Sequence, residues 1–237
     1  MEILRASAAE AFALARAHPF KLLTFAVLTA EFARAVPGVY HLRCMWIVLR
    51  DVFLLRTRLA APLERLDAPV AMRGNRVGLG ALDWNLHMNN ATYALEADVA
   101  RYPWFTRFLA AGKSAAAYNR LAIANGTVST VFYREMRWGQ AFTMSTRCVG
   151  FDAKWVFLET RFIDEAAPAG RALHAVTLAR FVFKEARGAL RGKTVLPADV
   201  FALVGLAVPA GMPKSTGNES GTLLSRIANI NAEAKAE

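Results

Sequence analysis

The sequence predicts an α+β domain in which an antiparallel sheet packs on one long helix. Four segments rich in Val, Thr, Phe and Tyr follow one another closely, at about residues 121–133, 141–150, 155–163 and 172–184. Their connections are shorter than the crossover that parallel strands need, so neighbouring strands are expected to run antiparallel. A glycine-broken β segment at about 71–82 and a helical stretch precede them. One helix among five strands is typical of α+β architecture.

The expected helix lies between the first β segment and the other four. It is predicted to begin near Thr92 and to reach Tyr102, where Pro103 is expected to start a new short helix that Gly112 ends. Four residues recur at helical spacing and are predicted to form its buried face. They are Tyr93, Ala97, Ala100 and Trp104.

Composition narrows the class of protein. The chain has 237 residues, of which 55% are hydrophobic, so it has room for one domain with appendages. The formal net charge of +10 favours anionic partners, but no RNP-like strand or zinc finger accompanies it, and we expect no nucleic-acid partner. Cys44 and Cys148 are too few for a disulfide framework, and no histidines pair at ligand spacing. We therefore expect a reducing compartment, no metal site and no cofactor.

Changes of composition divide the chain into three parts. Residues 1–66 are apolar, punctuated by arginines, and predict a helical extension, whereas residues 67–190 carry the expected helix and strands. In the C-terminal segment, 191–237, a short helix at about 197–206 is expected to close the domain. A polar linker at about 211–221 and a marginal final helix follow it.

The N-terminal part is predicted to contain two helices. The uncharged run Leu22 to Ala30 is much shorter than the ~20 residues that cross a bilayer, so a simple transmembrane span is not expected. In the second helix, about 40–57, helical phasing places Arg43, Arg50 and Asp51 on one side and a broad apolar face opposite. The apolar face consists of Met45, Trp46, Val48, Leu49, Val52, Phe53 and Leu55.

This apolar face must be buried, and the residues leave two environments open. In one, the helix lies in a membrane interface and its arginines meet lipid phosphates; in the other, it packs on the domain or on a partner subunit. We expect an intracellular, membrane-associated protein. A mitochondrial presequence is a minority alternative, because Glu2 and Glu10 are acids that such peptides avoid.

A polar cluster with the sequence Asp-Trp-Asn-Leu-His-Met-Asn-Asn begins at Asp83, directly before the helix. Asn89 or Asn90 suits the N-cap, and the first helical turn offers unpaired N–H groups that polarise a carbonyl oxygen. The Asp83 carboxylate can attack a carbonyl carbon or deprotonate a water that does so, while Asn85 and His87 orient either species. The same residue types also serve as ordinary caps and turn formers.

The pattern Asp-x-Asn-x-His-x-Asn-Asn resembles the active-site motif of plant acyl-ACP thioesterases, which are hot-dog enzymes. The wider 4-hydroxybenzoyl-CoA thioesterase-like group has a related Asp-x-x-Gly-His-x-Asn-Asn pattern. The chain also resembles the thioesterase superfamily member six group, in which an apolar N-terminal segment precedes one hot-dog domain. The resemblance covers about residues 67–186. It implies a sheet wrapped around one long helix, a homodimer, and a catalytic set of Asp83, Asn85 and His87.

A second resemblance lies downstream. Phe132-Tyr133-Arg134-Glu135-Met136 looks like the Tyr-Arg-Arg-Glu-Cys strand of the plant enzymes, which implies a supporting acid role for Glu135. Met136 replaces their cysteine and excludes a thiol nucleophile there. An ordinary salt-bridging role for Glu135 is the alternative. Leu86 stands where many relatives have glycine, and Ala81 where many have a further aspartate, so oxyanion geometry and substrate fit are expected to differ.

Together these observations predict an acyl thioesterase that hydrolyses a fatty-acyl thioester of coenzyme A or acyl-carrier protein. Asp83, Asn85, His87 and Glu135 form the expected catalytic set. Asn89, Asn90 and Tyr93 are expected to contact the substrate. The alternative is a hot-dog protein that binds an acyl group or lipid at a membrane without hydrolysing it.

Overall fold

A computed structural model describes residues 19–32, 36, 38–58, 60–112, 120–164, 166–168 and 172–212. The expectations for a presequence at the N-terminus and for a helix at the C-terminus lie outside these residues, as does most of the expected linker.

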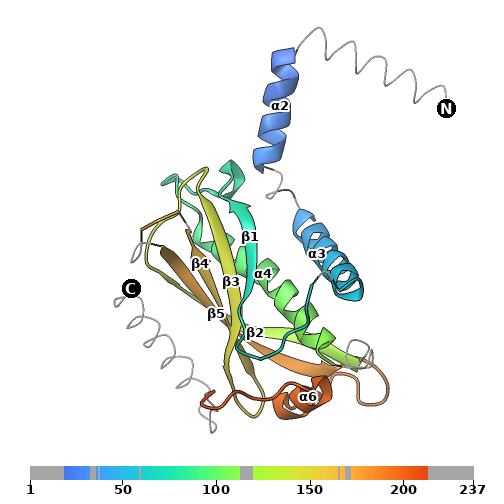
Figure 1. Cartoon of the computed structure of the whole chain (residues 1–237). Helices are drawn as coiled ribbons and strands as arrows, with labels where there is room; N and C mark the ends of the chain where they lie inside the picture. The colour runs from blue at the N-terminus through green and yellow to red at the C-terminus, as the bar shows by residue number, and fades with distance from the viewer. Residues whose placement is uncertain are drawn as a thin grey trace, which may run out of the picture.

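The centre of the molecule is an antiparallel sheet in the order β1-β3-β4-β5-β2, with β6 paired to β5 (Figure 1). Each of the four predicted later strands is present with its ends within two residues of the expected positions. The strands are β1 Val70–Arg76, β2 Leu121–Phe132, β3 Ala141–Phe151, β4 Val156–Ile163, β5 Leu173–Glu185 and β6 Thr194–Val195. The sheet curves around one long helix, α4, Asn90–Ala110. The α+β class and the hot-dog fold are therefore confirmed.

The first strand is shorter than the predicted segment 71–82. It ends at Arg76 and is followed by a 3₁₀ turn, η2 Leu79–Ala81. Inside the strand, Gly74 has a φ of +76°, and the register with β3 shifts between Met72 and Asn75. A glycine in the left-handed region forms a bulge at low cost, which bends the strand. The pairing continues past the bulge to Arg76, opposite Ala141 at the start of β3.

Pro103 does not interrupt the helix, in contrast to the sequence-based expectation. α4 continues through it to Ala110, and Trp104 and Phe108, which follow it, are fully buried. Proline in a helix interior removes one hydrogen bond and costs about 3 kcal/mol. Burying two large aromatic side chains stabilises the helix by about as much or more, so the core keeps α4 continuous.

The core consists of two main clusters along α4. In the first, Trp104 stacks on Phe108 with ring centroids 5.0 Å apart, and Phe108 contacts Phe183 of β5 and Phe201 of α6. α6, Pro197–Val204, closes this end of the sheet as predicted and ends at Gly205, whose φ is +71°. The second cluster surrounds the N-terminal half of α4, and it fixes the segment that precedes the helix. Its buried members include Met88, Tyr93, Ala97, Met136 and Phe162.

The N-terminal part forms two helices, α2 Pro19–Phe32 and α3 Val39–Arg56. α3 lies along α4, and the side that packs is the one carrying the charged residues (Figure 1). Arg43 donates two hydrogen bonds, of 2.8 and 2.7 Å, to the carboxylate of Glu96 on α4. Asp51 is buried and its Oδ2 accepts a hydrogen bond from Thr106 Oγ1 at 3.3 Å.

The expected burial of the opposite, apolar face of α3 is not found within the part of the chain that the structure describes. Most of its large side chains are exposed, with Trp46 at 66% and Phe53 at 60%, whereas Val48 is half-buried and lines a cavity between α3 and α4. α2 is also largely exposed and stands out from the domain. Among the described residues, no helix is both long and apolar enough to cross a membrane.

Candidate active site

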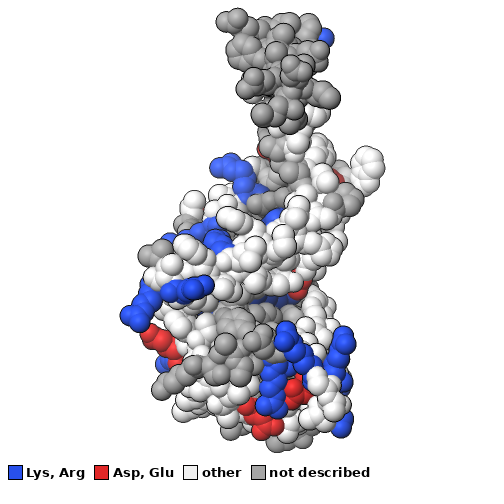
Figure 2. Space-filling view, turned by 90° about the vertical axis from the view of Figure 1, so that its right-hand side faces the viewer, with Lys and Arg blue, Asp and Glu red and all other residues white. Residues whose placement is uncertain are grey.

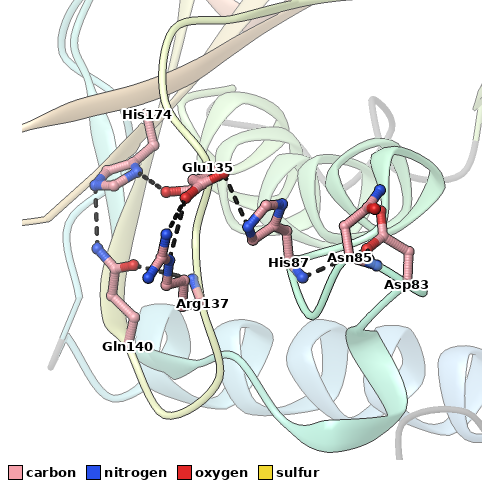
Figure 3. Close-up of polar contacts among 7 residues, drawn as sticks. All are labelled: Asp83, Asn85, His87, Glu135, Arg137, Gln140 and His174. Carbon is pink, nitrogen blue, oxygen red and sulfur yellow. Dashed lines mark hydrogen bonds and ion pairs between the residues drawn. The ribbon is translucent and has the colours of Figure 1, made fainter.

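The predicted polar cluster forms a tight turn between η2 and α4 (Figure 3). Asp83 N donates to His87 O at 2.9 Å, and Leu86 N donates to Asp83 O at 3.1 Å. Leu86 closes this turn with a φ of +60°, in the left-handed region that glycine adopts without strain. Leu86 is therefore accommodated in this turn at an energetic cost, without loss of the turn.

The Asp83 carboxylate is held by the backbone of its own turn. Oδ1 accepts hydrogen bonds from the N–H of Asn85 at 2.8 Å and from the N–H of His87 at 3.4 Å. Within the described residues, no hydrogen bond reaches Oδ2. The side chain is half-buried, so one oxygen is fixed by protein and the other is left to water or to a substrate.

The turn leads directly into the N-terminus of α4. Of the two predicted N-cap candidates, Asn89 is the cap, and its Oδ1 accepts a hydrogen bond from Ala91 N at 2.8 Å. Asn89 N is bonded in turn to Ala81 O at 2.8 Å, which anchors the cap to η2. Asn90 is the first helical residue and is exposed. The first turn of α4 therefore presents N–H groups and the positive end of the helix dipole beside the Asp83 turn.

A short antiparallel contact places His87 next to Glu135. Met88 N donates to Met136 O at 2.7 Å, and His87 forms a β-bridge with Arg137. Successive side chains in such a pairing point to opposite faces, so the two methionines enter the core while their neighbours face outward. His87 Nε2 consequently lies 2.9 Å from Glu135 Oε2.

Glu135 bridges His87 and Arg137. Its Oε1 accepts hydrogen bonds from Arg137 Nη2 at 2.5 Å and Nε at 3.1 Å. The hydrogen bonds from Arg137, followed by the charge of His87, lower the pKa of the Glu135 carboxyl below its ordinary value. Glu135 is 44% exposed, so it is an ionised acceptor at the surface that holds the imidazole from one side.

Behind Glu135 lies a polar cluster that the sequence reasoning missed. His174 of β5 is buried, its Nδ1 lies 3.1 Å from Glu135 O, and its Nε2 lies 3.1 Å from Gln140 Nε2. Gln140 also donates to Asp164 Oδ2 at 2.8 Å. The depression bordered by Glu135, Arg137, Gln140 and His174 has a volume of about 580 Å³. Side chains two residues apart in an extended segment point to the same face, so the position of Glu135 could have indicated that Arg137 lies at the site. No pattern in the sequence around His174 marks it as a site residue.

The structure brings most of the predicted site residues to one place. Asp83, Asn85 and His87 share the turn, and Glu135 lies beside His87, although the His87 ring is turned toward Glu135 and away from the Asp83 carboxylate (Figure 3). Tyr93 is different, because its side chain is only 2% exposed and belongs to the core. Burial also raises the pKa of Tyr93 to about 12. Within the described chain Tyr93 therefore has the core role that its helical spacing predicts.

With this geometry in place, comparison with known proteins assigns the family. Residues 77–217 match the model of the thioesterase-like superfamily. The match covers more than half of the chain, so the chain belongs to the thioesterase-like superfamily. This membership agrees with the resemblance drawn from the Asp83 motif.

Individual proteins resemble this chain at modest sequence identity. Protein THEM6 of Danio rerio is 33% identical over 130 residues, which are 54% of this chain and 58% of that protein. A probable thioesterase of Saccharomyces cerevisiae is 26% identical over 199 residues, 79% of this chain and 80% of the yeast protein. The match thus spans little more than half the length of the zebrafish relative.

Among solved structures, the 4-hydroxybenzoyl CoA thioesterase of Pseudomonas sp. strain CBS-3 is similar to this chain. Its TM-score is 0.44 and its sequence identity is 17%, with 57% of this chain and 98% of that chain covered.

Proposed function

We propose that this protein hydrolyses acyl thioesters of coenzyme A or acyl-carrier protein, with Asp83 as the catalytic carboxylate. The observation that carries the proposal is the Asp83 turn. Oδ1 of the carboxylate is fixed by two backbone N–H groups, Oδ2 is left without a hydrogen bond from the described residues, and the N-terminus of α4 follows directly. Membership in the thioesterase-like superfamily supports the same reaction class.

In this proposal the thioester carbonyl lies at the start of α4, where backbone N–H groups stabilise the negative charge on its oxygen. Asp83 removes a proton from water as the water attacks the carbonyl carbon. Collapse of the tetrahedral intermediate breaks the carbon–sulfur bond, and the carrier leaves as a thiol that receives the proton. Direct attack by Asp83, with later hydrolysis of the resulting anhydride, remains the alternative route.

Glu135 supports this chemistry through His87. When His87 donates Nε2–H to Glu135 Oε2, the neutral imidazole has no proton on Nδ1. Nδ1 has no hydrogen bond from the described residues, so it can accept one from the attacking water. Asn85, exposed at the tip of the turn, is proposed to orient the water or the carbonyl from the other side. The exposed Asn90 and the cap residue Asn89 are proposed to contact the substrate.

A thiol-release assay with a panel of acyl-CoAs tests the proposal. Asp83→Asn keeps the size of the side chain but removes the base, and it is expected to lower kcat by about 10²- to 10⁴-fold. Asp67→Asn, which changes an aspartate paired with Arg65 outside the turn, is the matched control and is expected to keep wild-type turnover. Undiminished turnover in Asp83→Asn would remove Asp83 from its role.

His87→Ala tests the positioning role separately. Because Nδ1 acts on the water and not on a long acyl tail, the substitution is expected to lower kcat more than it raises KM. Glu135→Gln keeps a hydrogen-bond acceptor for Nε2 and is expected to have a smaller effect than His87→Ala. A rise in KM alone for His87→Ala would make His87 a substrate-binding residue instead.

A binding protein without turnover is the second candidate function. The observation that favours it is the orientation of His87, whose ring is held by Glu135 on the side away from Asp83. A protein of this kind would copurify with uncleaved lipid and release no thiol from any acyl-CoA of the panel. Thiol release that depends on Asp83 would exclude it.

We also propose that the protein is a homodimer joined through β2. This strand is at one edge of the sheet and, within the described residues, pairs only with β5. Val128 and Phe132 on it are exposed, and an open edge strand pairs readily with a second copy. Light scattering is expected to give a dimer for wild type and for Val128→Ala, and a monomer for Val128→Lys. A monomeric wild type would contradict the proposal.

The apolar face of α3 is proposed to lie on an intracellular membrane surface. It is broad and free of lysine and arginine, as the side of the molecule shown in Figure 2 illustrates. The sequence-based expectation that Arg43 and Arg50 meet lipid headgroups is not supported, because both are paired with carboxylates of the protein. Arg56 and Arg58 remain exposed at the end of the helix for that role.

Liposome co-sedimentation at low and high salt tests this location. The double substitution Trp46→Ser/Phe53→Ser removes two exposed apolar side chains of α3 and is expected to release the protein from anionic liposomes. Leu190→Ser/Leu196→Ser makes a similar change at exposed residues elsewhere and is the control. Equal sedimentation of the two variants would contradict the proposed membrane face.

A further inference from the structure

A second cavity lies away from the Asp83 turn, between α3, the C-terminal half of α4, and strands β2 and β5. Its volume is about 340 Å³, within the roughly 300–1,000 Å³ of small-molecule sites. Arg101, one of its lining residues, is separated from Asn90 by about 17 Å along α4, at 1.5 Å per residue. Most of the wall is apolar, with Val48, Phe105, Leu109, Ile123 and Phe181 among its members.

Arg101 gives this cavity an unusual chemistry. Its side chain is 1% exposed, and no hydrogen bond from the described residues reaches Nε, Nη1 or Nη2. Asp98 Oδ1 lies 3.5 Å from Nη1, which is an ion-pair contact but too long for a good hydrogen bond. The Phe181 ring centroid lies 5.6 Å from Cζ. Arg101 is thus a deeply buried cation that contacts one carboxylate, Asp98, and makes no hydrogen bond of good geometry with the described residues.

The pairing with Asp98 is incomplete because Asp98 is shared. Its other oxygen, Oδ2, accepts a hydrogen bond from the Tyr40 hydroxyl of α3. Burial lowers the pKa of Arg101 to about 10, and Asp98 partly opposes this shift. The guanidinium therefore remains charged at neutral pH. A buried charge without hydrogen bonds is costly, and an acceptor that enters the cavity would relieve that cost.

We propose that this cavity binds a fatty acid, with the carboxylate on the Arg101 guanidinium and the alkyl chain along the apolar wall. The planar fork of arginine matches a carboxylate with two parallel hydrogen bonds. Asp98 already contributes one negative charge, so a singly charged head suits the site better than a doubly charged phosphate. The site takes a free acid, so it does not require thioester hydrolysis at Asp83.

Calorimetric titration of the full chain with dodecanoate, dodecanol and dodecyl phosphate, below micelle-forming concentrations, tests the proposal. Wild type is expected to bind dodecanoate at least about tenfold more tightly than either of the other two, because hydrogen bonds to charged groups are the strong ones. Arg101→Met, which keeps the volume of the side chain, is expected to remove this preference. Arg65→Met, at an exposed arginine, is the control and is expected to retain it.

Val48→Trp tests the same cavity without changing the charge. The larger side chain fills the cavity from α3 and leaves Arg101 in place. It is therefore expected to weaken the binding of both dodecanoate and dodecanol. This variant also keeps the proposal testable if Arg101→Met fails to fold. In thermal unfolding, dodecanoate is expected to raise the Tm of wild type but not of Val48→Trp. Dodecanoate binding that is equal in wild type and Val48→Trp, or stronger binding of dodecyl phosphate, would overturn the proposal. Loss of thiol release would contradict only the function proposed for Asp83.

Discussion

The two long helices that lie side by side, α3 and α4, are held in different ways. The sheet surrounds α4, and residues from several of its turns, including Tyr93, Ala97 and Trp104, are buried. α3 contacts the domain along one side only, through Arg43, Cys44 and Asp51 among others, and exposes large apolar side chains on the other.

The difference shows that an apolar face does not by itself identify the buried face of a helix. In α3, charged residues share the intramolecular contact with the buried Cys44 and Ile47, because α4 supplies partners for them, such as Glu96 for Arg43. The apolar face is left for another surface. The following substitutions test that contrast.

The largest expected effect on stability comes from a pair of tryptophan substitutions, one in the core and one on the exposed face of α3. Trp104→Ala opens a cavity in the core and is expected to lower the free energy of unfolding by about 3–5 kcal/mol. Trp46→Ala changes an exposed side chain of α3 and is expected to stay within about 0.5 kcal/mol of wild type. Urea denaturation measures both. A comparable loss in Trp46→Ala would show that the outward face of α3 is covered by protein.

The contact between the two helices should give an intermediate effect. Arg43→Met removes the bidentate partner of the buried Glu96 and is expected to cost about 2 kcal/mol. Arg65→Met, which removes the exposed ion pair with Asp67 away from the two helices, is expected to cost under about 1 kcal/mol. Thermal unfolding separates the two. Equal losses would mean that the buried pair does not hold α3 on the domain.

Local patterns predicted most of the domain because they reflect local physics. Alternating β-branched and aromatic residues located the four later strands, and a polar residue before a helical stretch located the Asn89 cap. The errors arose where tertiary contacts outweighed local preference. Pro103 is carried through α4 by the core, and α3 turns its charged side inward because Glu96 and Thr106 lie there.

The residues of the candidate site likewise comprise some that the sequence predicted and others that it did not. The Asp83 turn is contiguous in sequence, so its motif was visible. The family resemblance implied a supporting role for Glu135 but not its contact with His87, and His174 joins the site from β5 without any local pattern. The Arg101 cavity needs α3, α4 and two strands at once, and helical spacing alone assigns Arg101 no special role.

The smallest expected stability effect concerns the turn that begins α4. Leu86→Gly relieves a left-handed leucine and is expected to stabilise the fold by up to about 1 kcal/mol, because glycine adopts this backbone without strain. Leu95→Gly, inside α4, is expected to destabilise it by about 1 kcal/mol. Chemical denaturation measures both. Destabilisation by Leu86→Gly would show that the leucine side chain contributes more than its backbone strain costs.

Single-turnover hydrolysis, with protein in excess over a long-chain acyl-CoA, tests the central claim most directly. It isolates the chemical step, in which the Asp83 carboxylate is proposed to act. Wild type is expected to release thiol in a fast first turnover. Asp83→Asn is expected to bind the substrate but to release thiol at least about 10²-fold more slowly. Equal first-turnover rates for wild type and Asp83→Asn would contradict the account.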